Sequence, residues 1–419
     1  MAVNSRSLVS LLTLLPLLLT WTSTSTSAFE TIENPFVGGD PENGWKWLPP
    51  VPTADLHLKW PVTGTNSVMP VYQSSGLDKS AVTRAIIVPG GKASLSTYSP
   101  RDSWSYWITI KNILSYSAEV DPSINASTIS IMSPVFLASV DIEQGAGNAT
   151  QLYWSKSGWF SGTYAEGPHA DDKISSFQVL DDLVAHYADK EKYPNLQVCC
   201  RCVVLYLDSH PKARIILIIV KEIIFAAHSA GAQFFQRYAA MRIPTKDDSI
   251  IHYIPANPGS FLWLVEDRPA PNDSCPNVDR YKYGLSSGYP GYSTGNIKKI
   301  GREGVVERYR SRNIHYAQGT ADHGPGDLTC QGITQGSTHL ERGENFLDML
   351  NANGGMPSNQ TIDWIKGVSH QNDKMFNSTA LRTRMFISAT GPSTGTRPQS
   401  KREVIARTSG FRQVRRELD

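Results

Sequence analysis

Short apolar or strand-like runs alternate along the chain with longer segments in which apolar residues recur every three or four positions. The runs have the length of buried strands and are found at 85–88, 129–136, 223–227, 250–255 and 314–318. Helical spacing is clear at 103–117 and 175–190. Strands that alternate with helices predict an α/β fold with a mostly parallel, doubly wound sheet, in which chemistry gathers beyond the carboxyl ends of the strands.

The two ends of the chain fall outside this alternation. Residues 1–28 join a positive start, an apolar run at 8–19 and a Ser/Thr-rich stretch that ends in a small residue, which predicts a signal peptide. The apolar run is too short to span a bilayer as an ordinary helix. Residues 391–419 are basic and poor in apolar side chains, which predicts a disordered tail. We therefore expect one domain over 29–390 in a secreted, extracellular protein that is not associated with a membrane.

Residues 198–221 interrupt the expected short link between a helix and the run at 223–227. They hold Cys199, Cys200 and Cys202, followed by a second apolar run. Cysteines this crowded, without histidines at ligand spacing, fit neither a disulfide framework nor a zinc site. The stretch is either an extra strand or sequence foreign to the folded product, such as translated intron, and we favour the second interpretation.

The run at 223–227 leads directly into the sequence AHSAG, and a helix-like segment follows at 234–241. A small-X-Ser-X-Gly sequence between a strand and a helix is typical of a nucleophile elbow, in which the tight turn tolerates only small neighbours. Ala227 stands where glycine is usual. The alternative is an ordinary serine-containing turn, but the flanking strand and helix favour the elbow. Ser229 is therefore the predicted nucleophile, and the amide of Ala230 is a predicted oxyanion-hole donor.

A serine hydroxyl attacks well only when a base takes its proton and a carboxylate orients that base. In elbow-type hydrolases the chain order is serine, acid, histidine. The strand-like run at 314–318 is followed by Asp322, our predicted acid, with Asp327 as the alternative; Asp322 could also simply cap a turn. His370 lies on a loop after the last apolar stretch and is the predicted base.

The other histidines fit the role of the base less well. His228 is adjacent to the nucleophile, so its side chain must diverge from the hydroxyl. His252 and His315 lie inside strand-like runs and are expected to be core or sheet residues. His323 directly follows the predicted acid, and His339 is a weaker candidate.

A second oxyanion donor is expected in the loop after 85–88, at Gly91 or Lys92, where glycine lets the backbone approach a substrate. The following stretch, 93–100, is rich in serine and threonine and lengthens this loop unusually.

The composition of the chain bears on its binding partners and on its class of protein. A net charge of +2 argues neither for a nucleic-acid partner nor for an acidic surface partner, and we expect no nucleic acid to bind. A content of 19% charged and 40% hydrophobic residues is typical of a globular protein. Most of the ten tryptophans are expected in the core or lining a groove, with carbohydrate stacking as an alternative.

Export permits a disulfide, for which we prefer the pair Cys275 and Cys330. It also permits glycosylation, at the sequons of Asn125, Asn148, Asn272, Asn359 and Asn377.

In these features the chain resembles the α/β-hydrolase superfamily and, more narrowly, secreted fungal serine hydrolases within it. The resemblance is carried by segments at 101–104, 159–162, 175–181, 193–196, 227–233, 319–322 and 367–370. It implies a sheet of about eight strands with helices on both faces, a Ser229–Asp322–His370 triad, and esterase chemistry without a cofactor or metal. The departures from the family's pattern are Ala227, the interruption at 198–221 and the long oxyanion loop.

We therefore expect a secreted serine hydrolase that cleaves a carboxylic ester, small or polymeric, through an acyl-enzyme, and that acts as a monomer. One alternative is an inactive α/β-hydrolase-fold protein that serves in binding or in the cell wall. Another is a serine peptidase on the same fold.

Overall fold

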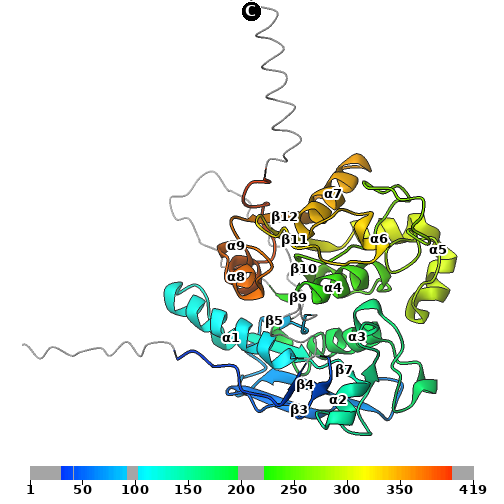
Figure 1. Ribbon diagram of the computed structural model, residues 1–419. Helices are drawn as coiled ribbons and strands as arrows, with labels where there is room; N and C mark the ends of the chain where they lie inside the picture. Colours follow the sequence, from blue (N-terminus) through cyan, green and yellow to red (C-terminus); the bar gives the residue numbers. More distant parts are fainter. Residues whose placement is uncertain (1–29, 41, 92–101, 197–220, 399–419) are drawn as a thin grey trace, which may run out of the picture. The chain divides into compact units, whose positions relative to one another are not determined.

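An eight-stranded sheet forms the centre of the computed structural model, which describes residues 30–40, 42–91, 102–196 and 221–398 (Figure 1). Its strands are β3 (Ala54–Pro61), β4 (Val68–Ser74), β5 (Arg84–Ile87), β6 (Ile129–Pro134), β9 (Glu222–His228), β10 (Ile251–Ala256), β11 (Asn313–Gly319) and β12 (Gln360–Ile365). They are ordered β12-β11-β10-β9-β5-β6-β4-β3. All neighbours from β12 to β6 are parallel, and β4 is antiparallel to both β6 and β3. The predicted sheet of about eight mostly parallel strands is confirmed.

Strand β9 shows why the central strands have continuous apolar sequences. Ile223 and Phe225 pack into one hydrophobic cluster, while Ile224 and Ala226 pack into another on the opposite face. The first cluster includes residues of α3 (Ser176–Tyr187) and α4 (Ala230–Met241), and the second includes residues of α1 (Ser103–Val120). Because helices cover both faces of the sheet, neither face of this strand contacts solvent, and its sequence does not alternate between apolar and polar residues.

The remaining elements are shorter or lie outside the sheet. The helices are α2 (Ser139–Gln144), α5 (Gly291–Arg310), α6 (Cys330–Ile333), α7 (His339–Ala352), α8 (Asn372–Phe376) and α9 (Thr379–Arg382). Two small sheets pair β1 (Gly39–Asp40) with β2 (Gly44–Trp45), and β7 (Leu137–Ala138) with β8 (Tyr153–Trp154). Within the described ranges no helix combines the length and apolarity that crossing a bilayer requires.

The structure moves the boundary of the predicted tail beyond residue 391. The backbone amide and the hydroxyl of Thr394 donate to Oδ1 of Asp363 at 3.0 and 2.7 Å, and the Trp364 amide donates to the Thr394 carbonyl at 2.9 Å. Thr394 therefore lies beside β12, and Arg397 pairs with Glu344 and Asp348 of α7. The composition of the tail does not reveal the ordered contact with β12, because that contact is made by backbone groups and one buried carboxylate. The predicted signal peptide, residues 198–220 of the interruption and the rest of the tail lie outside the described residues.

A buried polar network joins the amino-terminal halves of the central strands. Arg84 on β5 forms an ion pair with Glu222, its cross-strand neighbour on β9, and both are almost fully buried. Nδ1 of His252 lies 3.0 Å from Nε2 of His315, and Nδ1 of His315 lies 2.8 Å from the Thr361 hydroxyl. The expectation that these two histidines are sheet residues with partners is confirmed.

This network makes folding sensitive to acid. Burial, with help from the positive charges of Arg84 and Arg384, lowers the pKa of His252 to about 3, whereas the pKa of an unfolded histidine is about 6.5. The unfolded chain therefore binds a proton that the folded chain rejects, so stability present above pH 6.5 is lost as the pH falls toward 3.

We expect the free energy of unfolding to fall less steeply with decreasing pH in His252→Phe than in the wild-type protein. The difference in slope should approach about 1.4 kcal/mol per pH unit, the value for one proton. Urea unfolding at several pH values between 6.5 and 4 measures it. His169→Phe, which removes an exposed histidine, is the matched control and should keep the wild-type slope. Parallel curves for His252→Phe and the wild type would contradict the prediction.

Candidate active site

The turn between β9 and α4 has the backbone of a nucleophile elbow. Ser229 has φ 57° and ψ −119°, a left-handed conformation that is strained for a residue with a side chain. Its amide donates to the Ala256 carbonyl at 3.0 Å, which fixes the bend against β10. A Cβ at Gly231 would lie 3.1 Å from both the Ala227 Cβ and the Gly90 carbonyl oxygen. Gly231 thus leaves room for the methyl group of Ala227, which is why alanine fits where glycine is usual.

The structure brings Ser229, His370 and Asp322 together. Nε2 of His370 lies 3.0 Å from the Ser229 hydroxyl, and its Nδ1 lies 2.7 Å from Oδ2 of Asp322. The three residues follow β9, β12 and β11 respectively, at the carboxyl ends of parallel strands. Because a carboxylate only accepts hydrogen bonds, His370 carries its proton on Nδ1, and its Nε2 is free to accept from the hydroxyl.

The carboxyl group of Asp322 stays ionised although its side chain is fully buried. Burial raises the pKa of its carboxyl group, but hydrogen bonds from His339 and His370 outweigh that effect and hold the pKa well below its usual value. The Leu340 amide donates to the Asp322 carbonyl at 3.0 Å and fixes the loop. The alternative acid, Asp327, instead accepts from Ser260 at 3.0 Å and from Tyr283 at 2.9 Å.

Two further imidazoles lie against His370. The ring centroid of His228 is 4.4 Å from that of His370, at an interplanar angle of 47°. The ring of His339 stacks on His370 at 3.9 Å and 27°. Nδ1 of His339 lies 3.3 Å from Oδ1 of Asp322. The neighbourhood of His339 and the acid was not predicted from sequence, where His339 was only a weaker base candidate.

Asp322, His339 and His370 are close enough together to be considered as metal ligands. An imidazole nitrogen binds zinc in the plane of its ring at about 2.0 Å. Two rings stacked face to face at 27° direct their lone pairs along nearly parallel planes, so they do not converge on one ion. Both Nδ1 atoms also face oxygen acceptors, which indicates that they carry protons. The arrangement fits a hydrogen-bond cluster.

The two predicted oxyanion donors lie in different surroundings. Ala230 is the first residue of α4, where backbone amides have no partner within the helix. Gly91 lies close to the hydroxyl of Tyr106, a buried residue of α1. A Cβ at Gly91 would meet that hydroxyl at 2.1 Å and lie 3.6 Å from the His228 carbonyl, so the loop passes close to the elbow. Lys92 lies outside the described residues, and the oxyanion role of Gly91 stays a prediction.

The predicted secretory features are distributed as follows. Cys275 and Cys330 form a disulfide that links the loop after β10 to α6. Four sequon asparagines are exposed, namely Asn125, Asn148, Asn272 and Asn377. Asn359 is half-buried, and its Nδ2 donates to the Arg312 carbonyl at 2.7 Å. A glycan on that nitrogen would have to displace the bond, so Asn359 is the least suited of the five sites.

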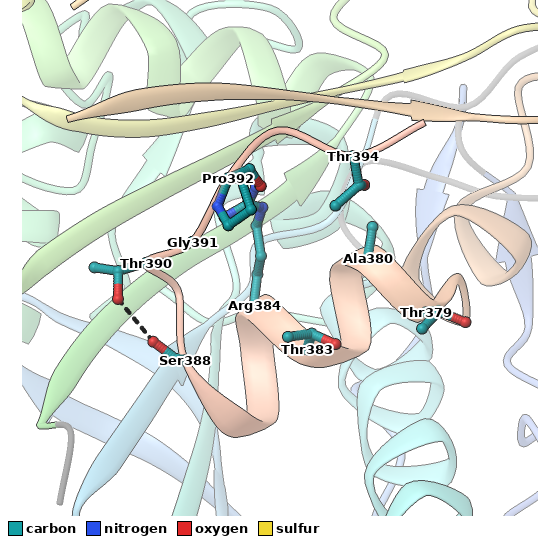
Figure 2. Close-up of a pocket in the computed structure, with 9 residues that line it drawn as sticks. All are labelled: Thr379, Ala380, Thr383, Arg384, Ser388, Thr390, Gly391, Pro392 and Thr394. Carbon is teal, nitrogen blue, oxygen red and sulfur yellow. Dashed lines mark hydrogen bonds between the residues drawn. The ribbon is translucent and has the colours of Figure 1, made fainter. Parts of the chain in front are cut away.

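Two cavities lie apart from the three residues. One of about 240 Å³ lies between α9 and the loop 388–394, with Arg384 in its wall (Figure 2). The guanidinium binds Asp363 and the carbonyls of Ala389 and Pro392, so no unpaired charge is offered to a ligand. The other, of about 560 Å³, is lined by Ser155, Ser157, Gly158, Ser161, Thr163, Tyr164, Tyr281, Lys282, Tyr283, Gly288, Tyr289, Pro290 and Gly291.

No protein-family model and no curated protein matches the chain. Among solved structures, it is similar to LpqC, a poly(3-hydroxybutyrate) depolymerase from Bordetella parapertussis, with 13% identity, 84% of this chain and 93% of that chain covered, and a TM-score of 0.47. It is similar to poly(aspartic acid) hydrolase-1 from Sphingomonas sp. KT-1, with 16% identity, 77% and 96% covered, and a TM-score of 0.45. It is also similar to the feruloyl esterase module from Clostridium thermocellum, with 11% identity, 83% of this chain and 93% of that chain covered, and a TM-score of 0.37.

At such identities and TM-scores these likenesses say nothing of a substrate, and the fold is assigned on the topology. The sheet has one antiparallel strand next to its edge, and the sharp turn that holds Ser229 joins a central strand to a helix. The acid and the histidine follow later strands in the order serine, aspartate, histidine. These are the features of the α/β-hydrolase fold, and this chain has that fold.

Proposed function

We propose that the protein is a serine hydrolase that cleaves carboxylic esters through an acyl-enzyme. The observation that carries the proposal is the continuous hydrogen-bonded line from the Ser229 hydroxyl through His370 to Asp322. Its support is independent of any relative, because a hydroxyl at the apex of a strained turn, a base at 3.0 Å and a buried carboxylate behind the base are what nucleophilic acyl transfer requires.

In the proposed reaction, the Ser229 oxygen attacks the ester carbonyl while Nε2 of His370 takes the hydroxyl proton. Asp322 holds the resulting imidazolium in place and balances its charge. The negative oxygen of the tetrahedral intermediate is received by the Ala230 amide and by a second donor from the Gly91 loop, each such donor being worth about 10²–10³ in rate. His370 then protonates the departing alcohol.

Deacylation repeats these steps with water. His370 takes a proton from a water molecule, the hydroxide attacks the acyl carbon, and the collapse of the second tetrahedral intermediate returns the proton to Ser229. Every proton moves between the substrate, water and the two side chains, so the sequence balances without any further group.

We also propose that the protein acts outside the cell as a monomer. The leader-like sequence at 1–28, the disulfide and the four exposed sequons all support export. The even balance of charge, at +2, gives no reason to add a nucleic-acid partner.

A substrate panel tests the ester assignment. The protein should hydrolyse nitrophenyl esters of short acids and leave a matched peptide nitroanilide intact, because an amide nitrogen is a poorer leaving group than a phenolate. Cleavage of the anilide at a comparable rate would favour the peptidase alternative. A folded protein that hydrolyses neither would favour the inactive binding protein.

A further inference from the structure

His339 contacts both members of the pair that would activate Ser229. Its Nδ1 lies 3.0 Å from the Gly324 carbonyl and 3.3 Å from Oδ1 of Asp322, and its ring stacks on His370. Oδ1 of Asp322 is buried and makes no hydrogen bond of full geometry within the described ranges, so its polar contact is the longer one, of 3.3 Å, with Nδ1 of His339. The carboxylate thus bonds His370 through one oxygen and faces the N–H of His339 with the other.

The Gly324 carbonyl decides which nitrogen of His339 carries the proton. A carbonyl only accepts, so Nδ1 must be the protonated nitrogen, and the same N–H is shared with the more distant Oδ1 of Asp322. Burial lowers the pKa of His339, although its hydrogen bond to Asp322 opposes this effect. His339 therefore donates as a neutral ring and adds no positive charge beside His370.

The backbone of α7 holds His339 in this position. Thr338 caps the helix by accepting from the Glu341 amide at 3.1 Å. The His339 amide donates to the Gly324 carbonyl at 2.9 Å, and the next amide donates to the carbonyl of Asp322. The first turn of α7 and the loop carrying the acid are therefore joined by two backbone hydrogen bonds that do not need the imidazole.

We propose that His339 is a positioning residue for the hydrolysis: its Nδ1–H donates to Asp322, and its ring supports that of His370, so that the acid and the base keep the orientation that activates Ser229. The inference rests on the proposed function. It adds a fourth side chain to the machinery, one that touches neither the ester nor water and acts through the acid and the base.

Two substitutions separate the hydrogen bond from the ring. Asparagine carries an amide N–H near the position of Nδ1 but has no ring, so His339→Asn keeps the donor. Phenylalanine keeps a ring but has no donor, so His339→Phe removes the N–H that faces Oδ1 of Asp322. We expect kcat for a nitrophenyl ester to fall about 10-fold to 100-fold in His339→Phe, the range for losing a hydrogen bond to a buried charge, with KM almost unchanged.

His339→Asn should recover most of this loss. A second measurement needs no substrate: the far-downfield proton NMR signal of the His370 Nδ1–H, identified by its absence in His370→Gln, should shift or broaden in His339→Phe and persist in His339→Asn. His315→Phe is the matched control, since it removes a buried histidine that also stacks on another histidine but lies in the sheet. Its kcat per folded molecule should equal that of the wild type.

The outcomes are distinguishable. Wild-type kcat and an unchanged proton signal in His339→Phe would overturn the positioning role, as would an equal loss in the asparagine and phenylalanine variants. If the wild type turns over no ester while the signal still depends on His339 in the predicted way, the positioning stands and the proposed function fails.

Discussion

Replacing Ser229 by alanine should abolish ester hydrolysis, with kcat falling by at least about 10⁴-fold. The alanine removes the only atom that can form the acyl-enzyme, while the strained turn, His370 and Asp322 remain. His370→Ala should be comparably severe, and the double variant hardly worse than either single one, because serine and base act as a unit. Initial rates with a nitrophenyl ester measure all three.

Covalent labelling identifies the nucleophile directly. A fluorophosphonate should modify the wild-type protein on the peptide that contains Ser229, as read by mass spectrometry, and leave Ser229→Ala unmodified. Ser260→Ala is the matched control, because Ser260 also follows a central strand but is buried, and its one O–H is shared between oxygens of Gln233 and Asp327. It should label like the wild type. An adduct on the same peptide in Ser229→Ala would place the nucleophile at another residue and contradict the proposal.

The strands that carry the site could be predicted because they are buried on both faces. The predicted strands at 223–227, 250–255 and 314–318 have their counterparts in β9, β10 and β11, with ends that differ by a residue or so. Since parallel strands end at one edge of the sheet, knowing that a serine, an aspartate and a histidine follow such strands was enough to expect them together. Chain order then limited the acid and the base to a few candidates.

Elements without that apolar signal could not be placed from the sequence. Helix α5 has a polar sequence and a break at Gly301, where φ is 65°, so its periodicity is weak. The edge strand β3 is half-exposed and has a bulge. Both are held by tertiary contacts that local sequence does not reveal.

His339 shows the limit for the site itself. The sequence from Thr338 to Glu341 has the T-x-x-E spacing of a helix start, so the beginning of α7 could have been predicted. The loop between Asp322 and His339 places the imidazole beside the acid. Its path is fixed by the Gly324 carbonyl, which accepts from both the amide and Nδ1 of His339. No spacing rule encodes that path, and an exposed first-turn histidine would have the same local sequence.

The largest expected effect on stability lies at the opposite end of the same strands. Replacing Arg84 by methionine should lower the free energy of unfolding by about 3–5 kcal/mol, the cost of leaving a buried charge without its partner. Within the described ranges, Glu222, whose side chain is 2% exposed, would then keep the Ala389 amide at 3.0 Å and Nε2 of His252 at 3.8 Å as its polar partners. Arg84 also donates to the Arg384 carbonyl at 3.4 Å, so the segment after α9 would lose an anchor.

A double-mutant cycle distinguishes this cause from a simple loss of packing. Arg84→Met with Glu222→Leu removes both charges, and the pair should be less destabilised than Arg84→Met alone, because no buried carboxylate is left unpaired. Urea unfolding at pH 7 followed by circular dichroism measures the four proteins. If the double variant is as unstable as the sum of the two single ones, the two charges are not coupled and the ion pair does not hold these strands. Because the pair lies at the amino ends of β5 and β9, while Ser229 follows the carboxyl end of β9, fluorophosphonate labelling of the folded fraction should be unchanged throughout the cycle.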